Sequence, residues 1–253
     1  MNPQNADPDV RAELAPTGTL RAAINTGNFL LVNSQTTNGD PTGVSPDIAA
    51  EIARRLGTPL ELVLYPDPGL LSDAATAGEW DIGNIGAERQ RAQSIAFSAA
   101  YCEIASTYLV PADSQIHAVD EVDRPGNRIA TKGRAAYGLW LENNLQHAEL
   151  VRSTTIDDSF DTFVEQKLDA LAGLRPRLLS DVARLPGARI LEGQFSAVQQ
   201  SVGTLRDRHA SAAWIAEVVE DLKVSGFVAE VIAKHNVSGL SVAPLASSRS
   251  LTG

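Results

Sequence analysis

GVSPDIAAEIARRLGTPLELV, residues 43–63, carries the signals that decide the fold class. Ser45 is expected to be the N-cap of a helix, because its hydroxyl can accept a hydrogen bond from a free backbone N–H. Pro46 suits the first helical position and Asp47 suits the positive end of the helix. Gly57 is expected to end the helix. Apolar residues recur at every fourth position, which predicts one buried face: Ile48, Ile52 and Leu56.

The segments on either side of this helix extend the pattern into an alternating α/β order. LRAAI (20–24) precedes it and LELVLY (60–65) follows it, and both are apolar enough for strands. GLLSDAATAGEW (69–80) is expected to be a second helix, and DIGNIG (81–86) a third strand. A β-α-β-α-β order predicts a parallel sheet with helices on its faces.

The same theme returns in the second half of the chain. Strands are expected at STYLVPA (106–112), RIATKG (128–133), ELVRS (149–153), DALAGL (169–174), ARILEG (188–193) and SAVQQSVGT (196–204). Helices are expected at 134–145, 155–168 with Thr155 as N-cap, 175–185, and 209–235 with a break near Gly226. The chain therefore predicts two α/β units of similar size, followed by C-terminal helices.

Composition excludes several classes of protein. The 253 residues hold 21 Lys+Arg and 31 Asp+Glu, a net charge of −10, so no nucleic-acid partner is expected. A hydrophobic content of 43% is enough for a real core, and no apolar run is long enough to span a membrane. The single cysteine, Cys102, cannot form an internal disulfide and is expected to be buried and inert.

No cofactor or metal site is expected from the motifs. The four histidines are scattered without the spacing of metal ligands: His117, His147, His209 and His235. The sequence holds neither a Walker-type loop nor a G-x-G-x-x-G motif. Two acids, Glu88 and Asp67, follow the ends of expected strands, where such groups are usually solvated.

The N-terminal segment, residues 1–17, is expected to be a polar and mobile lead-in. Acidic residues and prolines interrupt it, so it does not have the apolar stretch of a secretory signal. Two interpretations stay open: the protein is cytoplasmic, or an export signal has been removed from this sequence.

Four stretches, taken in order along the chain, resemble the type II periplasmic solute-binding proteins of polar amino-acid uptake systems. The first is the opening stretch, residues 43–63, and the second is ERQRAQSIAFSAAY (88–101). The third runs from TYLVPADSQI (107–116) through DEVDRPGNRIATKGRAAY (120–137). The fourth is LKVSGFVAEVIAKHNVSGLSVAP (222–244). The resemblance spans residues 18–245, and four motifs in the correct order identify the chain as a member of this fold family.

The resemblance implies an α/β fold of two lobes, each a mostly parallel sheet flanked by helices, with the ligand enclosed between them by hinge closure. Lobe one is expected at 18–109 together with 202–253, and lobe two at 110–201. The two hinge strands are expected at STYLVPA and AVQQSVGT, residues 197–204.

In lobe one, the resemblance makes Arg91 the clamp for a ligand carboxylate, because it stands seven residues before Ser98. A guanidinium presents a planar fork that matches two carboxylate oxygens. The alternative is a solvated surface arginine like Arg89. Further candidate ligand contacts in this lobe are Gly86, Asn84, Asn28, Phe29 and Tyr65, with Phe29 equally suited to a core position.

In lobe two, the candidates are Arg134 and Tyr137, at the start of a helix whose free N–H groups suit an anion. Arg134 instead could only cap a strand end. Relatives place an aspartate after the strand at 169–174 to pair with a ligand ammonium, whereas Leu174 and Arg175 stand here. This departure favours a carboxylate ligand that has no ammonium, unless Arg175 points to solvent and another acceptor serves.

The resemblance therefore predicts a monomeric, non-enzymatic binding component of an ABC-type uptake system, periplasmic or at the cell surface, that takes a small carboxylate-bearing solute. The expected partners are that solute and an ABC permease. Two alternatives stay open on the same fold: a dehydratase-like enzyme acting on a cyclic carboxylate, and a ligand sensor. Arginines stand near 175–177, where the glutamate of such dehydratases would fall, which counts against the enzyme.

Overall fold

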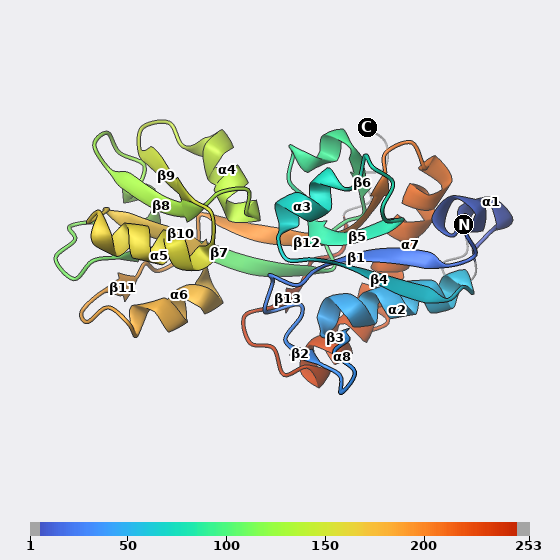
Figure 1. Cartoon of the computed structure of the whole chain (residues 1–253). Coiled ribbons are helices and arrows are strands. Elements are labelled where there is room, and N and C mark those ends of the chain that lie inside the picture. The colour runs from blue at the N-terminus through green and yellow to red at the C-terminus, as the bar shows by residue number, and fades with distance from the viewer. Residues whose placement is uncertain (1–5, 247–253) are drawn as a thin grey trace. The chain divides into compact units, whose positions relative to one another are not determined.

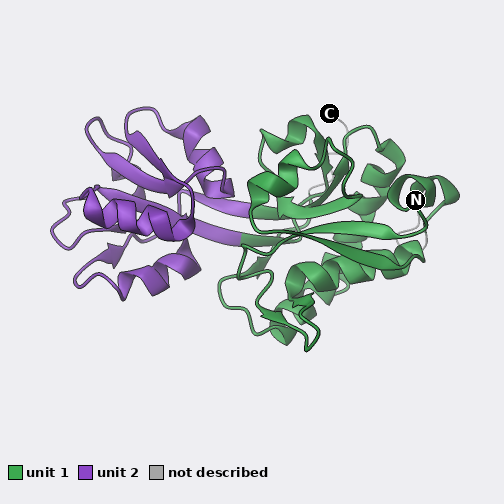
Figure 2. Ribbon diagram, viewed as in Figure 1, with its two compact units in different colours: residues 1–103, 199–253 green, residues 104–198 purple. Residues whose placement is uncertain are grey.

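The computed structural model describes residues 6–246 of the chain. It contains two compact units: Met1–Glu103 with Gln199–Gly253 (unit 1), and Ile104–Val198 (unit 2) (Figure 2). The chain passes from one unit to the other along two strands, β7 (Cys102–Val110) and β12 (Ser196–Leu205). Residues 1–5 of the expected lead-in and residues 247–253 of the expected lobe one lie outside the described residues. Among the described residues, no helix has the length and apolarity needed to cross a membrane.

Unit 1 is built on the strand order β4-β1-β5-β12 (Figure 1). The first three strands, β4 (Leu60–Tyr65), β1 (Leu20–Asn25) and β5 (Ile82–Gly86), run parallel, and β12 is antiparallel to β5. The short strand β6 (Ile95–Phe97) also pairs with β12, and β13 (Ser241–Val242) pairs with β7. A separate two-stranded ribbon joins β2 (Ser34–Gln35) and β3 (Pro41–Thr42). The helices are α1 (Pro8–Leu14), α2 (Val44–Leu56), α3 (Pro68–Asp73), α7 (His209–Val224) and α8 (Phe227–Lys234).

The two faces of the unit 1 sheet carry separate cores, because successive side chains of a strand point to opposite faces. On one face, Ala22 and Ile24 pack in a cluster that includes residues of α2, α7 and α8. On the other face, Ala23 packs in a cluster with Leu71 and Trp80. The period-4 pattern predicted for α2 is confirmed, since Ile48, Ile52 and Leu56 are all buried in the first cluster.

Two expectations about helix ends in unit 1 are wrong. Helix α2 begins at Val44 with Gly43 as N-cap, because the Ser45 hydroxyl is buried and lies 3.2 Å from the Tyr101 hydroxyl instead of capping the helix. Helix α3 ends at Asp73, well before residue 80, since the segment that follows is a turn whose Trp80 ring fills the second core. Gly57, in the left-handed conformation, does end α2, and Gly226 does separate α7 from α8.

The lead-in expected over residues 1–17 contains helix α1. Val10 and Leu14 lie one helical turn apart and are both buried in the first core of unit 1. Asp7 precedes the helix and Pro8 occupies its first turn, which is a favoured start. The helix has only seven residues and two buried apolar side chains, so its periodicity is too short to predict it from the sequence.

Gly43 is a position where the fold requires glycine. Its φ of 152° is unfavourable for other residues, and an added Cβ would overlap the Leu31 carbonyl oxygen. We expect Gly43→Ala to lower the free energy of unfolding by about 2–4 kcal/mol, from backbone strain together with steric overlap. Urea denaturation measures this loss. Gly39→Ala is the matched control, because Gly39 has φ 88° but no atom near an added Cβ. Equal losses in the two variants would contradict the steric argument.

Unit 2 has the strand order β7-β10-β8-β9 (Figure 1). Strands β10 (Ala170–Leu174), β8 (Arg128–Lys132) and β9 (Glu149–Ser153) are parallel, while β7 is antiparallel to β10. The two-residue strand β11 (Arg189–Ile190) also pairs with β7. The helices are α4 (Ala136–Asn144), α5 (Ile156–Glu165) and α6 (Arg175–Val182), with a 3-10 turn η2 (Val119–Glu121).

The unit 2 sheet also separates two cores. Ile129 and Ala172 belong to the cluster on one face, and Ala130 and Leu171 to the cluster on the other. Thr155 is confirmed as the N-cap of α5: its hydroxyl accepts the Asp158 N–H at 3.0 Å, and the Asp158 carboxylate accepts the Thr155 N–H. This reciprocal arrangement is a capping box, which fixes where α5 starts after β9.

Candidate functional site

The carboxyl ends of the three parallel strands of unit 1 meet at one edge of its sheet. Asn25 ends β1 and is paired in register with Tyr65, which ends β4. Gly86 ends β5 on the other side of β1. The connecting loops start at this edge, and ligands of parallel sheets bind there. The candidate residues of unit 1 all lie in these strand ends and loops.

Arg91 is held in place by a turn that follows β5. The Ala87 N–H donates to the Gln199 carbonyl at 2.9 Å, and the Arg91 N–H donates to the Glu88 carbonyl at 3.0 Å. The 3-10 turn η1 (Arg91–Gln93) then leads into β6. Both ends of the loop are therefore tied to β12, and the chain between Gly86 and Arg91 folds back on itself.

This turn places the Arg91 guanidinium against two acceptors. Its Nη1 donates to the Gly86 carbonyl at 2.9 Å and forms an ion pair with the Glu88 carboxylate. The Arg91 side chain is 3% exposed and that of Glu88 is 11% exposed. The alternative of a solvated surface arginine is therefore wrong, and so is the expectation that Glu88 is a solvated acid.

Gly86 makes room for this pair. A Cβ added at Gly86 would lie 2.6 Å from Glu88 Oε1, so a larger residue here would require the Glu88 carboxylate to shift. Burial raises the pKa of Glu88, against the opposing effect of the neighbouring Arg91 guanidinium. The site thus contains a largely buried acid and a buried base in direct contact, at the end of β5.

Asn84 is a polar residue within β5, two residues before Gly86. It is paired in register with Ile24 of β1 and Val202 of β12, and it is 1% exposed. Among the described residues, neither its Nδ2 nor its Oδ1 has a hydrogen-bond partner. An unpaired buried amide is costly, so its donor and acceptor call for a partner.

Tyr65, Asn28 and Phe29 have different surroundings. The Tyr65 hydroxyl donates to Glu79 Oε2 at 2.8 Å, and burial with this bond raises its pKa to about 12. Asn28 is buried and its side-chain oxygen accepts the Leu30 N–H, which stabilises the loop itself. Phe29 is 41% exposed, so the alternative of a core position for Phe29 is wrong.

In unit 2, Arg134 and Tyr137 flank the start of α4. Arg134 is exposed and has a φ of 61°, which is a strained conformation for a residue with a side chain. Tyr137 is buried, and burial raises the pKa of its hydroxyl. Along the chain they stand before and after Ala135, the N-cap, and only Tyr137 is buried.

Leu174 and Arg175 stand where β10 passes into α6. Leu174 is the N-cap residue of α6. The Arg175 Nη2 donates to the Leu191 carbonyl at 3.1 Å and also to the Gly193 carbonyl. Arg175 therefore stabilises the segment after β11, and the alternative that it simply points to solvent is wrong.

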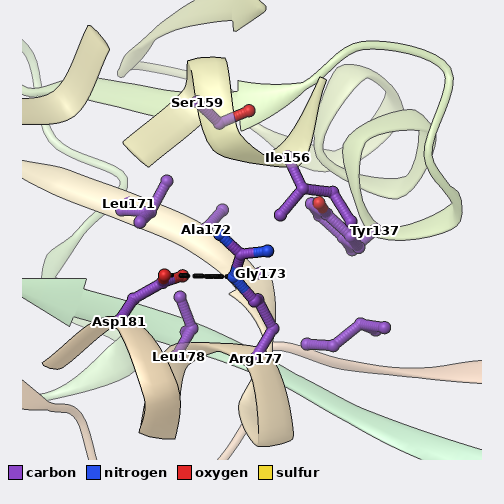
Figure 3. Close-up of a pocket in the computed structure, with 10 residues that line it drawn as sticks. Tyr137, Ile156, Ser159, Leu171, Ala172, Gly173, Arg177, Leu178 and Asp181 are labelled. Atoms are coloured by element: carbon purple, nitrogen blue, oxygen red, sulfur yellow. Dashed lines mark hydrogen bonds and ion pairs between the residues drawn. The ribbon is translucent and has the colours of Figure 1, made fainter. Parts of the chain in front are cut away.

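A small cavity of about 10 Å³ lies beside these residues within unit 2 (Figure 3). Its lining residues include Tyr137, Leu174, Arg177 and Asp181. Figure 3 marks the interaction between Arg177 and Asp181 with a dashed line. Asp181 is 2% exposed at its side chain and also contacts Arg184. A cavity of this size admits about one water molecule, so this cavity by itself is too small for a solute.

The structure thus brings three groups together at one place in unit 1: Arg91, Gly86 and Glu88. The sequence predicts a solvated Glu88, whereas its carboxylate pairs with Arg91. The spacing of three residues between Glu88 and Arg91 is the sequence feature that indicates such a pair. Gln199 donates to Glu103 at 2.8 Å, bridging β12 and β7. Within residues 6–246, no group of three or more His, Cys, Asp or Glu side chains could hold a metal ion.

Comparison with known proteins gives a consistent result. The profile of the bacterial extracellular solute-binding proteins, family 3, matches residues 22–238. A search of the curated proteins found no match. The structure is similar to a mutant of ArgBP from T. maritima, with a TM-score of 0.69 and 22% identity, covering 90% of this chain and 100% of that one.

Two further solved structures have the same fold. One is a putative binding component of an ABC transporter from Wolinella succinogenes complexed with lysine (TM-score 0.70, 17% identity, 87% of this chain and 97% of that one). The other is the ancestral amino acid-binding protein AncCDT-1, a precursor of cyclohexadienyl dehydratase (TM-score 0.67, 20% identity, 88% and 97%). At these identities the likeness establishes the α/β type II fold.

Proposed function

The chain belongs to the bacterial extracellular solute-binding proteins, family 3, and from this premise we propose that it is the binding component of an ABC-type uptake system. Its ligand is a small solute that carries a carboxylate, either amino-acid-like or an organic acid. Arg91 is the group that binds the carboxylate. Closure of the two units on the ligand, which the family resemblance implies, stays a prediction.

The observation that supports this proposal best is the buried Arg91 at the end of β5. A guanidinium with a 3% exposed side chain is costly to bury, and here its nearest acid is itself nearly buried. Such an arrangement stands at the sheet edge where parallel strands bind ligands, and not in the middle of a core. The solved relatives from T. maritima and W. succinogenes are described as ArgBP and as a lysine complex, which agrees with a carboxylate-bearing ligand.

The remaining site residues and partners are proposed on the same basis. Gly86 and Asn84 assist Arg91, while Asn28, Phe29 and Tyr65 in unit 1 and Arg134, Tyr137, Leu174 and Arg175 in unit 2 are further candidate contacts. The partner is an ABC permease, the protein acts as a monomer, and the place of action is the periplasm or cell surface. The likeness to AncCDT-1 leaves a dehydratase as the alternative function. Against it, Arg175 and Arg177 stand where the glutamate of such enzymes is expected, and they contact backbone carbonyls and acids.

A thermal-shift screen tests the proposal. The panel contains α-amino acids, opines, keto acids, dicarboxylates and aromatic acids, each with the purified protein at pH 7. We expect one class to raise the melting temperature saturably, because ligand at 100 times its Kd adds about 2.7 kcal/mol to the free energy of unfolding. That gain corresponds to a shift of about 5–10 °C for a chain of this size. Consumption of the compound that shifts most would favour the enzyme, and no shift across the panel would contradict the proposal.

A further inference from the structure

The groups around Arg91 match more of a ligand than a carboxylate. The Glu88 carboxylate and the Gly86 carbonyl are acceptors, and Arg91 is a cationic donor. Two residues before Gly86 on β5, the Asn84 amide offers both an unpaired donor and an unpaired acceptor. Glu88, Gly86 and Arg91 lie in direct contact with one another. An acid and a base in contact complement a head group that carries an anion and a cation on neighbouring atoms.

Unit 2 has no acid where the ammonium partner is expected. Leu174 occupies that position, and the two acids that contact Arg177 nearby are already engaged. Asp181 accepts from Arg177 Nε at 3.0 Å through both of its oxygens, and Asp157 forms an ion pair with the same guanidinium at 2.5 Å. A ligand ammonium that turned to Asp157 or Asp181 would therefore have to break an existing charge pair.

We propose that Glu88 is the counter-charge for the ammonium of an α-amino acid, so that unit 1 alone recognises the zwitterionic head group. The inference rests on the proposed function, since it needs Arg91 to bind the ligand carboxylate. In the structure Glu88 and Arg91 form an ion pair with each other. Binding opens the pair: Arg91 takes the ligand carboxylate, and Glu88 together with the Gly86 carbonyl takes the ligand ammonium.

The charge balance of the buried pair favours this ligand over a simple carboxylate. A carboxylate without an ammonium would bring a second negative charge beside Glu88 in a poorly solvated place, where like charges repel strongly. A zwitterion adds no net charge, and it replaces one charge-assisted contact with two. This proposal differs from the expectation, based on Leu174 and Arg175, of a ligand without an ammonium, because Glu88 of unit 1 would supply the counter-charge.

Matched pairs of probes test the inference by isothermal titration calorimetry at pH 7. Each pair is an α-amino acid and the same acid without its amino group: L-leucine and 4-methylpentanoate, L-phenylalanine and 3-phenylpropanoate, L-glutamate and glutarate, L-lysine and 6-aminohexanoate, L-arginine and 5-guanidinopentanoate. In the native protein we expect the amino acid of the best pair to bind about 100-fold more tightly than its partner, because loss of the ammonium leaves Glu88 facing a carboxylate.

Glu88→Gln assigns that preference to one side chain. We expect the preference to fall below about tenfold in this variant, with the amino acid weakened and the deamino acid unchanged or tighter. Glu51→Gln is the matched control, since Glu51 also pairs with an arginine three residues away, on α2. It should keep the full preference. If Glu88→Gln does not fold, Glu88→Asp keeps the charge, and the preference of the native protein is measured without any variant.

The outcomes separate the two proposals. Native protein that binds deamino acids as tightly as amino acids overturns the assignment of Glu88 and leaves the carboxylate site intact. The same holds if Glu88→Gln keeps the native preference. Native protein that binds no probe of either kind overturns both the site and this assignment.

Discussion

Replacing Arg91 by methionine is expected to remove ligand binding almost completely. The affinity for the panel compound that shifts the native protein most should fall by about 2–5 kcal/mol, or ~30- to 5,000-fold, because a largely desolvated charge partner is lost. Methionine fills a similar buried volume without the charge, so the loss reports on the guanidinium. Isothermal titration calorimetry of the variant against that compound gives the number.

Two further variants separate binding from folding in this experiment. Arg91→Met leaves the Glu88 carboxylate buried without its partner, which destabilises the unit. Adding Glu88→Gln removes that orphaned charge, so the double variant should regain stability but not affinity. Arg89→Met is the control, because Arg89 is the exposed neighbour in the same loop. Native affinity in Arg91→Met would show that the carboxylate binds elsewhere.

Much of the fold was predictable because its signals are local. The buried face of α2 follows from the spacing of Ile48, Ile52 and Leu56, and the start of α5 from Thr155. The left-handed glycines Gly57 and Gly226 mark helix ends in the sequence as they do in the structure. Each of these features depends on residues within one or two turns of each other.

The errors arise where a distant partner decides. Ser45 looks like an N-cap, but Tyr101, 56 residues away, lies within reach of its hydroxyl. Glu88 looks like a solvated acid until the turn before η1 is folded and tied to β12. The motif predicts Arg91 as a ligand contact, whereas its burial and its ion pair with Glu88 depend on tertiary packing. No local pattern contains that information.

Unit 1 also contains a buried ion cluster that no local sequence pattern predicts. Asp81, just before β5, is fully buried. Its carboxylate accepts from the Arg21 Nε and Nη2 and from the Arg21 backbone N–H, each at 3.0 Å. Arg208, before α7, donates to the same carboxylate at 3.0 Å. One acid thus joins β1, the start of β5 and the entry to α7, although Arg208 stands 127 residues after Asp81 in the sequence. It also raises the pKa of Arg21.

Asp81→Asn should therefore be among the most destabilising single changes in unit 1. It leaves two guanidinium groups around a neutral amide whose NH2 faces other donors, and removal of one partner from a buried charge network costs about 3–5 kcal/mol. Asp40→Asn, at an exposed loop position, should change the free energy of unfolding by less than ~0.5 kcal/mol.

Tryptophan fluorescence during urea denaturation can assign the Asp81 loss to unit 1. Trp80 and Trp214 are both fully buried in the cores of unit 1, and Trp140 packs in unit 2. In a Trp140→Phe background, the signal reports on unit 1 alone, so the two units need not unfold in one transition. The midpoint for Asp81→Asn should then fall well below that of Asp40→Asn. If the two midpoints coincide, the ion cluster contributes little to the stability of unit 1. Solvation of the freed arginines would then offset the lost contacts. Water would reach the cluster at Arg208 and Arg21, whose side chains are 17% and 24% exposed.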